Sequence, residues 1–267
     1  MAGGCLECMG RIPYASLIAT VLCCVGAGVI GGTLYEALRL TDDSIFMELF
    51  EINIEWMNML RIIIIIVASV MGGIAIILLI FGFLSTGATR KNVYSGNKCI
   101  MGGRISAGFF MVLTYIFNLG WVVATSIMVI PVMAFFMLRS ICYEEVNNYL
   151  KLYGHTDFIP RNDYCFKLAQ FGIYRNVTIE GGRNQACNEE LKRLCEVVDE
   201  AGPLYIVAYC GGVVLILGLS LFMITLAFNY TRIKIAKELT EYRDAMDLEH
   251  TELDMVVENK NSAKVPY

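Results

Sequence analysis

Cysteine is the residue type in this 267-residue sequence that offers the most chemistry. Ten cysteines are present, and four of them share one hydrophilic stretch: Cys142, Cys165, Cys187 and Cys195. An even number in one segment predicts two disulfide bonds, formed in an oxidising compartment. Spacing alone leaves all three pairings of four cysteines open.

The remaining cysteines lie beside or inside apolar segments. Cys5 and Cys8 precede the first of these segments, and Cys99 lies in a short basic stretch. Cytosolic thiols close to a membrane are typical sites of S-palmitoylation, so these three are candidate lipidation sites. The other three lie within apolar segments and are interpreted as small packing residues: Cys23, Cys24 and Cys210.

The elements that position these cysteines are four long segments without a charged residue. They cover residues 12–35, 62–89, 105–138 and 201–231. Only 17% of the chain is charged and 57% is apolar, and each segment exceeds the roughly 20 residues that a helix needs to cross a bilayer. The sequence therefore predicts an all-α membrane protein, a bundle of four transmembrane helices with a small disulfide-stapled extracellular loop domain.

The charges between the spans predict their orientation. Residues 85–106 hold Arg90, Lys91, Lys98 and Arg104 without a carboxylate, whereas residues 36–61 hold six carboxylates. Basic loops remain in the cytosol. The glycosylation sequon Asn176-Val177-Thr178 lies in the same stretch as the four cysteines, which supports this orientation. A second triplet, Asn229-Tyr230-Thr231, would lie at the cytosolic face and is interpreted as chance.

The predicted organisation follows from these boundaries. The spans are residues 14–35, 62–84, 107–138 and 204–230; loops 36–61 and 139–203 are extracellular; residues 1–13, 85–106 and 231–267 are cytosolic. Two helices are expected outside the spans. Leu191, Leu194 and Val198 have helical spacing within residues 188–200, and Ile235, Leu239, Tyr242 and Met246 continue that spacing beyond the fourth span.

Helix packing is expected to use small and polar residues. Gly28 and Gly32 form a small-xxx-small ridge that permits close contact, either within the bundle or between two copies of the chain. Pro131 is expected to kink the third span. Intramembrane polar residues such as Asn118 and Ser220 are expected to bond between helices.

Enzyme chemistry is poorly supported. The two histidines, His155 and His250, are predicted on opposite sides of the membrane, and neither a phosphate-binding glycine loop nor a zinc-ligand spacing occurs. The sequence therefore predicts no catalytic residue, no metal and no cofactor. The net charge of −4 also disfavours a nucleic-acid partner.

Predicted partners follow from the surfaces. Acyl chains on Cys5 and Cys8 favour sterol-rich lipid, and the basic loop favours the anionic inner leaflet. Other membrane proteins, in cis or in trans, and a second copy of the chain are further expected partners. The terminal Val265-Pro266-Tyr267 is a weak match to a ligand of PDZ-type domains.

Several motifs together resemble one family. Cys5 and Cys8 precede Ile12-Pro13-Tyr14-Ala15-Ser16-Leu17-Ile18-Ala19-Thr20, and the long loop orders Cys142, Cys165, Gln170-Phe171-Gly172-Ile173, Cys187 and Cys195. Shorter matches are Glu36-Ala37-Leu38, Gly82-Phe83, Thr86-Gly87-Ala88, Thr114-Tyr115, Trp121 and Pro131-Val132. The chain resembles the myelin proteolipid protein family, closest to its neuronal membrane glycoprotein branch, as an invertebrate-type member.

The resemblance implies a multi-pass plasma-membrane proteolipid acylated near its N-terminus. It also implies nested disulfides, Cys142–Cys195 outside Cys165–Cys187, and a non-catalytic role in membrane organisation, cell contact and the shape of cell processes. This sequence departs from the family at Gly31-Gly32-Thr33-Leu34-Tyr35, where the family has two cysteines, and in its tail. A role in compact myelin is therefore not supported.

The sequence disfavours two other classes of membrane protein. A channel or transporter is opposed by spans that lack charged residues, because such proteins often place ionisable groups at membrane depth. A tetraspanin- or claudin-like junction scaffold is opposed by the cysteine pattern, since the long loop lacks Cys-Cys-Gly and residues 36–61 contain no cysteine.

Overall fold

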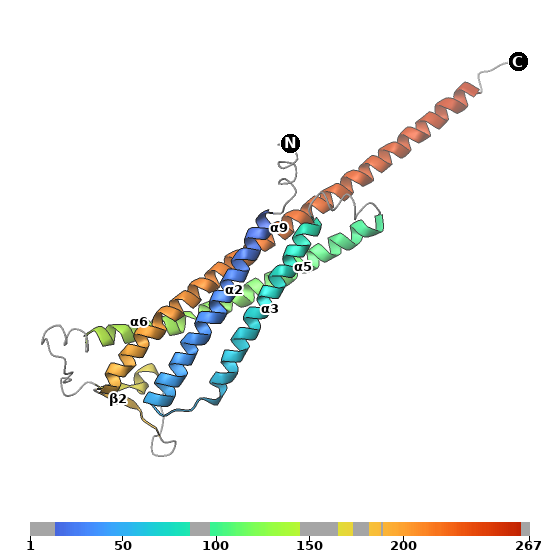
Figure 1. The fold of residues 1–267 in the computed structure, drawn as a ribbon. Helices are drawn as coiled ribbons and strands as arrows, with labels where there is room; N and C mark the ends of the chain where they lie inside the picture. The colour runs from blue at the N-terminus through green and yellow to red at the C-terminus, as the bar shows by residue number, and fades with distance from the viewer. Residues whose placement is uncertain (1–13, 86–96, 145–164, 173–181, 188, 263–267) are drawn as a thin grey trace, which may run out of the picture.

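The fold, taken from a computed structural model, is a bundle of long helices (Figure 1). The structure describes residues 14–85, 97–144, 165–172, 182–187 and 189–262. Four stretches of this described chain are long and apolar enough to cross a membrane: Tyr14–Leu49, Glu55–Gly82, Gly108–Cys142 and Glu189–Arg232. A helix is the expected form for such stretches, because it satisfies every backbone polar group within its own segment.

The first two spans form a pair of neighbouring helices. α2 (Tyr14–Leu40) continues into a π-helical segment, η1 (Thr41–Leu49), and α3 (Glu55–Ser85) returns along α2. One face of α3 is a row of exposed isoleucines and valines, including Ile62, Ile66 and Val70. In a bilayer this face meets acyl chains, so its exposure is the expected arrangement.

The third span is divided into two helices. α5 (Asn97–Ile127) ends one residue before Met128, and α6 (Val129–Cys142) begins directly after it. Pro131 has no N–H to donate to the carbonyl of Ile127, so the regular hydrogen-bond ladder cannot continue through this point. The interruption therefore lies where the sequence places the proline.

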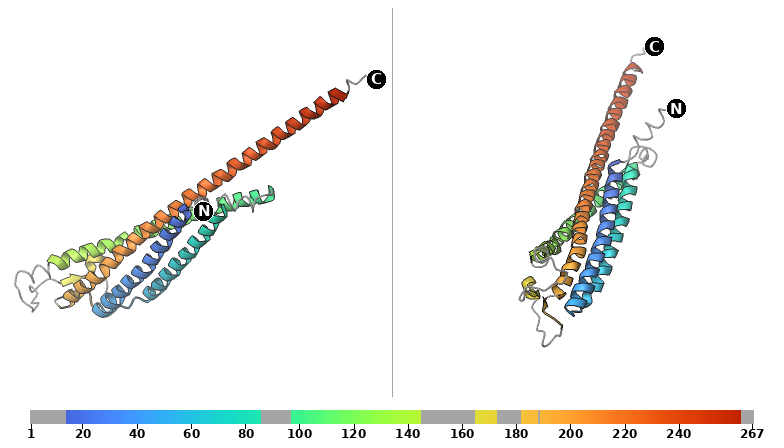
Figure 2. Two further views of the ribbon diagram at one scale, coloured as in Figure 1. Left: turned by 45° about the horizontal axis from the view of Figure 1, so that its top comes forward. Right: turned by 60° about the vertical axis from the view of Figure 1, so that its left-hand side comes forward.

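The fourth span belongs to one helix that extends far beyond it in both directions. α9 (Glu189–Ser262) is 74 residues long and contains Pro203. It includes the two flanking helices that the sequence predicts, and its N-terminal end lies 15 residues before residue 204, where the fourth span was expected to begin. Figure 2 shows its C-terminal part extending past the other helices.

The core of the bundle lies where α9 packs against α2 and α5. A Cβ atom at Gly26 would lie 2.8 Å from the carbonyl oxygen of Gly211, so α2 and α9 approach more closely than any larger side chain permits. The small-residue ridge of Gly28 and Gly32 does not take part in this contact, since a Cβ atom at either residue would meet nothing within 4 Å. Gly26 therefore makes the intramolecular contact, and Gly28 and Gly32 do not.

Polar side chains at membrane depth bond mostly within their own helices. Asn118 donates to Ser220 at 3.3 Å and thereby joins α5 to α9. Ser69, Thr114 and Ser126 instead donate to the carbonyl four residues earlier. Of these four residues, Asn118 alone forms the interhelical hydrogen bond that the sequence predicts.

Candidate functional site

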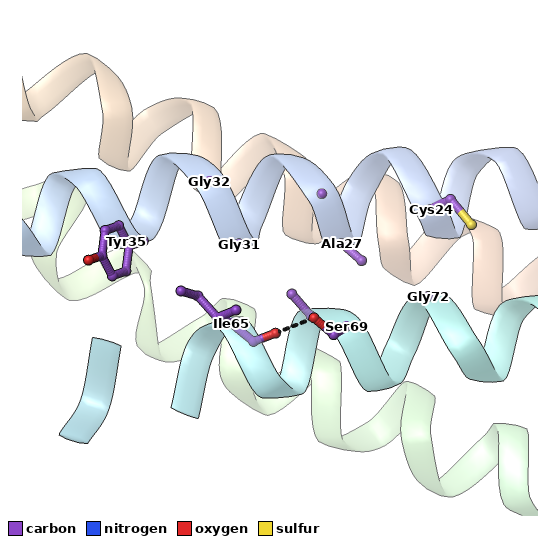
Figure 3. Close-up of a pocket in the computed structure, with 10 residues that line it drawn as sticks. Cys24, Ala27, Gly31, Gly32, Tyr35, Ile65, Ser69 and Gly72 are labelled. Atoms are coloured by element: carbon purple, nitrogen blue, oxygen red, sulfur yellow. Dashed lines mark hydrogen bonds between the residues drawn. The ribbon is translucent and has the colours of Figure 1, made fainter. Parts of the chain in front are cut away.

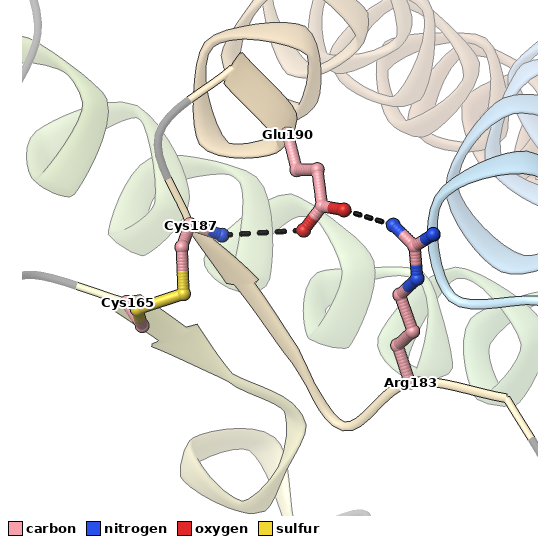
Figure 4. Close-up of a disulfide and its surroundings, with 4 residues drawn as sticks. All are labelled: Cys165, Arg183, Cys187 and Glu190. Carbon is pink, nitrogen blue, oxygen red and sulfur yellow. Dashed lines mark hydrogen bonds and ion pairs between the residues drawn. A yellow bond between two sulfur atoms is a disulfide. The ribbon is translucent and has the colours of Figure 1, made fainter.

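The strongest candidate site is a small domain at one end of the bundle, built around a two-stranded sheet. β1 (Cys165–Lys167) runs antiparallel to β2 (Gln185–Cys187), and Cys165 lies directly opposite Cys187. A disulfide joins these two residues across the strands, with their Cα atoms 4.5 Å apart (Figure 4). That Cα distance is the usual one for a pair that does not exchange hydrogen bonds, where side chains come closest. A 3₁₀ turn, η3 (Leu168–Phe171), follows β1.

A second disulfide attaches this sheet region to the bundle. Cys142 at the end of α6 is bonded to Cys195 in the first turns of α9, with 5.6 Å between their Cα atoms. The pair encloses Cys165–Cys187 in sequence, which is the nested order that the family resemblance implies. Among the other described cysteines, Cys23 is buried in the core, whereas Cys24 and Cys210 are exposed on the helix surface.

A hydrophobic core lies beneath the two disulfides. Phe50, from the connection between α2 and α3, is completely buried there, and its ring centroid lies 6.4 Å from that of Phe166. The other buried members are Leu49, Phe135, Cys142, Leu168, Ala186, Leu191, Leu194, Cys195 and Val198. We call this unit the loop domain: residues 49–52, β1, η3, residues 182–187 and residues 189–198 of α9. The two connections predicted to be separate loops therefore fold as one unit.

Polar contacts join the same two connections at the surface. The backbone N–H of Arg183 donates to the carbonyl of Phe50 at 2.9 Å, and its guanidinium lies 3.4 Å from the carboxylate of Glu51. Arg193 on α9 forms an ion pair with Glu48. Sequence reasoning missed the roles of Phe50, Glu48 and Glu51. The available signal was Phe50, a large aromatic residue that lies among the carboxylates of residues 36–61 and could have indicated a buried contact.

Glu190 links the sheet to the start of α9. Its carboxylate accepts a hydrogen bond from the backbone N–H of Cys187 at 3.4 Å and forms an ion pair with Arg183 (Figure 4). A carboxylate in the first helical turn also interacts favourably with the positive end of the helix dipole. The Glu190 side chain, which belongs to α9, therefore contacts both the end of β2 and Arg183. Arg183 in turn contacts Phe50 and Glu51.

A buried ion pair lies at the same end of the bundle, between η1 and α3. The guanidinium of Arg61 pairs with the carboxylate of Asp42, which is 1% exposed, and lies 3.5 Å from Asp43. Within the described structure, Asp42 Oδ1 and Arg61 Nε have no hydrogen-bond partner. From the sequence, Asp42 and Arg61 contributed only to the charge balance of residues 36–61, and no ion pair between them was predicted.

Gly28 and Gly32 line a shallow groove between α2 and α3. The groove has a volume of about 460 Å³, and Gly31, Ala68 and Gly72 contribute to its walls (Figure 3). The hydroxyl of Ser69 beside it donates to the carbonyl of Ile65 at 2.8 Å. Its lining residues belong to α2 and α3, and a Cβ atom at Gly28 or Gly32 would meet nothing within 4 Å.

Several predicted sites lie outside the described residues. They are Cys5, Cys8, Asn176 and the terminal Val265-Pro266-Tyr267. Cys99 lies within α5, but the position of its side chain is not described. Among the described residues, no cluster of three or more His, Cys, Asp or Glu side chains could hold a metal ion.

Comparison with known proteins identifies the family. The family model described as myelin proteolipid protein (PLP or lipophilin) matches residues 2–238. The chain belongs to the myelin proteolipid protein family. No solved structure matches it.

Individual relatives in this proteolipid family cover nearly the whole chain. Proteolipid protein DM beta of Squalus acanthias is 32% identical over 261 residues, which cover 93% of this chain and 88% of the relative. The human neuronal membrane glycoprotein M6-a is 30% identical, with the same coverage of both chains. Human M6-b is 30% identical over 86% of each chain. The four-helix fold and the resemblance inferred from sequence motifs are thereby confirmed.

Proposed function

We propose that this proteolipid is a non-enzymatic, multi-pass plasma-membrane protein that organises membrane domains and cell contacts or the shape of cell processes. In this proposal the loop domain is extracellular and both termini are cytosolic. Membership of the myelin proteolipid family removes the tetraspanin- or claudin-like alternative from another family. The relatives are named as proteolipid proteins and membrane glycoproteins.

The observation that carries the proposal is the firm attachment of the loop domain to the membrane bundle. The disulfide Cys142–Cys195 joins it to α6, and the buried ring of Phe50 holds residues 49–52, which lead from η1 into α3, against the two-stranded sheet. A surface held in a fixed orientation loses little conformational entropy when it meets a partner. This arrangement suits a protein that presents one face to other membrane proteins, in cis or in trans.

The orientation rests on chemistry and charge. Two disulfides in the loop domain are stable in an oxidising compartment and not in the cytosol. The connection with Arg90, Lys91, Lys98 and Arg104 belongs on the cytosolic side, where anionic lipid attracts it by about 1 kcal/mol per charge. Acyl chains on Cys5 and Cys8 would add an affinity for ordered, sterol-rich lipid.

Recruitment to cell contacts tests the proposal. The tagged chain is expressed in cells that lack it, and its density at contacts between two expressing cells is compared with its density in free membrane. We expect enrichment at contacts for the wild type. Phe50→Ala should reach the surface but lose this enrichment, because the change releases the two-stranded sheet from residues 49–52.

Phe136→Ala is the matched control. Phe136 lies on α6 and is half exposed, so its loss leaves the loop domain intact. A uniform distribution of the wild type would contradict the proposal. Rapid solute flux through purified protein in liposomes would also contradict it and would favour a channel or transporter.

A further inference from the structure

The C-terminal part of α9 leaves the bundle as a single long helix. Residues 232–262, which we call the tail helix, extend past the ends of α2, α3 and α5 (Figures 1 and 2). At 1.5 Å per residue, these residues make a rod of about 46 Å. An isolated helix in water has little stability of its own and usually depends on packing of an apolar face.

The tail helix has such a face, and it is uncovered. Ile235, Leu239, Tyr242 and Met246 are all exposed, Leu239 by 66% and Tyr242 by 72%. Their intervals of four, three and four residues average about 3.7, and the 3.5-residue repeat of a two-stranded coiled coil appears over residues 235–256, where the intervals are 4, 3, 4, 3, 4 and 3. In sequence, Leu253 and Val256 continue this repeat after one polar position, Glu249.

We propose that the tail helix pairs with the tail helix of a second copy of this chain as a parallel coiled coil. Copies that insert into one membrane with the same topology project their tails to the same side, so the two helices run in parallel. The four exposed apolar residues, which we call the seam, then pack against the same four residues of the second copy. The inference goes beyond the proposed function and does not depend on it.

The charges beside the seam fit a parallel pair. With Leu239 and Met246 at a positions and Ile235 and Tyr242 at d positions, Glu238 occupies a g position. In a parallel dimer each g residue faces the e residue five positions later on the other helix. That residue is Arg243, so the dimer gains two Glu–Arg pairs.

Residues 232–262 carry a net charge of −3, because basic residues at the two ends offset part of the acidic charge, but the acidic middle of the tail helix opposes a lipid surface as the partner of the seam. Residues 238–258 hold eight carboxylates and one arginine, a net charge of −7. An anionic leaflet would repel this segment. Most of these carboxylates lie outside the seam, where they remain in water when two helices pair. A second helix therefore covers the seam at a lower electrostatic cost than a bilayer does.

Cysteine crosslinking in membranes tests the pairing. Leu239→Cys and Leu248→Cys are made in the full-length chain, and a membrane-permeant oxidant is added to native membranes. Leu248 is a matched control, because it is the same residue type, is 68% exposed and lies at a c position away from the seam. We expect a disulfide-linked dimer for Leu239→Cys well above the background of the wild-type cysteines, and only that background for Leu248→Cys.

A second substitution then distinguishes a specific seam from random collision. In the Leu239→Cys chain, Met246→Glu should abolish the crosslink, whereas Leu248→Glu should leave it unchanged. Glu249→Leu should increase it, because that change replaces two facing carboxylates by an apolar contact. Equal crosslinking at positions 239 and 248, or a crosslink that survives Met246→Glu, would overturn the proposal.

Charge exchange tests the parallel register. Glu238→Lys alone places a lysine against Arg243 of the second copy and should reduce the crosslink, and Arg243→Glu alone should do the same. The double variant Glu238→Lys/Arg243→Glu restores opposite charges across the dimer and should recover it. Glu238 also lies 3.9 Å from Lys234 of its own helix. A failure of the double variant to recover the crosslink would overturn the register.

Discussion

The pair formed by Asp42 and Arg61 shows how one contact at the end of the bundle links two spans. Both side chains are buried, and the pair joins η1 to the first turns of α3. Removing one member of a buried ion pair leaves a desolvated charge without compensation, which is far more costly than losing an exposed pair. The exposed pair Glu36–Arg39 lies nearby on α2 and provides a comparison.

We therefore predict that Arg61→Met lowers the free energy of unfolding by about 3 kcal/mol or more. The double variant Asp42→Leu/Arg61→Met should recover most of this loss, because neither charge then remains buried. Arg39→Met should change stability far less. Reversible denaturation of detergent-solubilised protein by dodecyl sulfate, followed by circular dichroism, measures each midpoint. Equal midpoints for Arg61→Met and Arg39→Met would contradict the assigned role.

At the scale of elements, the loop domain depends on residues distant in sequence. β1 and β2 are only three residues each and cannot form a stable sheet alone. The disulfide Cys165–Cys187 closes 22 residues and should stabilise by about 3 kcal/mol in the chain-entropy model. The disulfide Cys142–Cys195 closes 53 residues, with about 4 kcal/mol expected from the same estimate.

The two disulfides predict a specific labelling pattern. Cys165→Ser should expose Cys187 to a membrane-impermeant maleimide on intact cells and leave Cys142 and Cys195 protected. Cys142→Ser should leave Cys195 as a free thiol that is labelled only after denaturation, because Cys195 is buried in the core of the loop domain. Mass spectrometry after labelling and proteolysis identifies the modified residue. A peptide that joins Cys142 to Cys165 in the wild type would exclude the nested pairing.

At the scale of the whole molecule, the proposed function requires the loop domain to lie on the extracellular side of the membrane. We predict that tags at either terminus are accessible to antibody only after permeabilisation, whereas a tag inserted next to Asn176 is accessible on intact cells. Enzymatic deglycosylation should increase the gel mobility of the wild type and have no effect on Asn176→Gln. A glycan that persists in this variant and disappears in Asn229→Gln would reverse the orientation.

Lipidation should affect where the molecule lies in the membrane and not whether it inserts. Four spans already anchor the chain, so acyl chains on Cys5 and Cys8 are not needed for attachment. Cys5→Ser/Cys8→Ser should fold and insert normally, lose thiol-linked palmitate and leave detergent-resistant membrane. Cys24→Ser, which changes an exposed thiol within α2, should retain the label. An absence of palmitate in the wild type, measured by acyl exchange, would exclude the sorting role.

The amino-acid sequence by itself determined the fold class and the family, because these depend on local properties. A charge-free segment long enough to cross a bilayer must be helical wherever it lies in the chain. The helical spacing of Leu191, Leu194 and Val198 likewise predicted a helix, and all three side chains are buried in the loop domain. Pro131 marked the division between α5 and α6 for an equally local reason, its missing N–H.

Only the tertiary structure decided which helix faces meet and which distant residues share a site. Gly26 packs against Gly211 while Gly28 and Gly32 face away, and this difference depends on the rotation of α2 about its axis. Phe50 enters the loop domain from another connection, and Asp42 meets Arg61 across 19 residues. Spacing along the chain cannot specify such contacts, because they arise from simultaneous packing of all the helices.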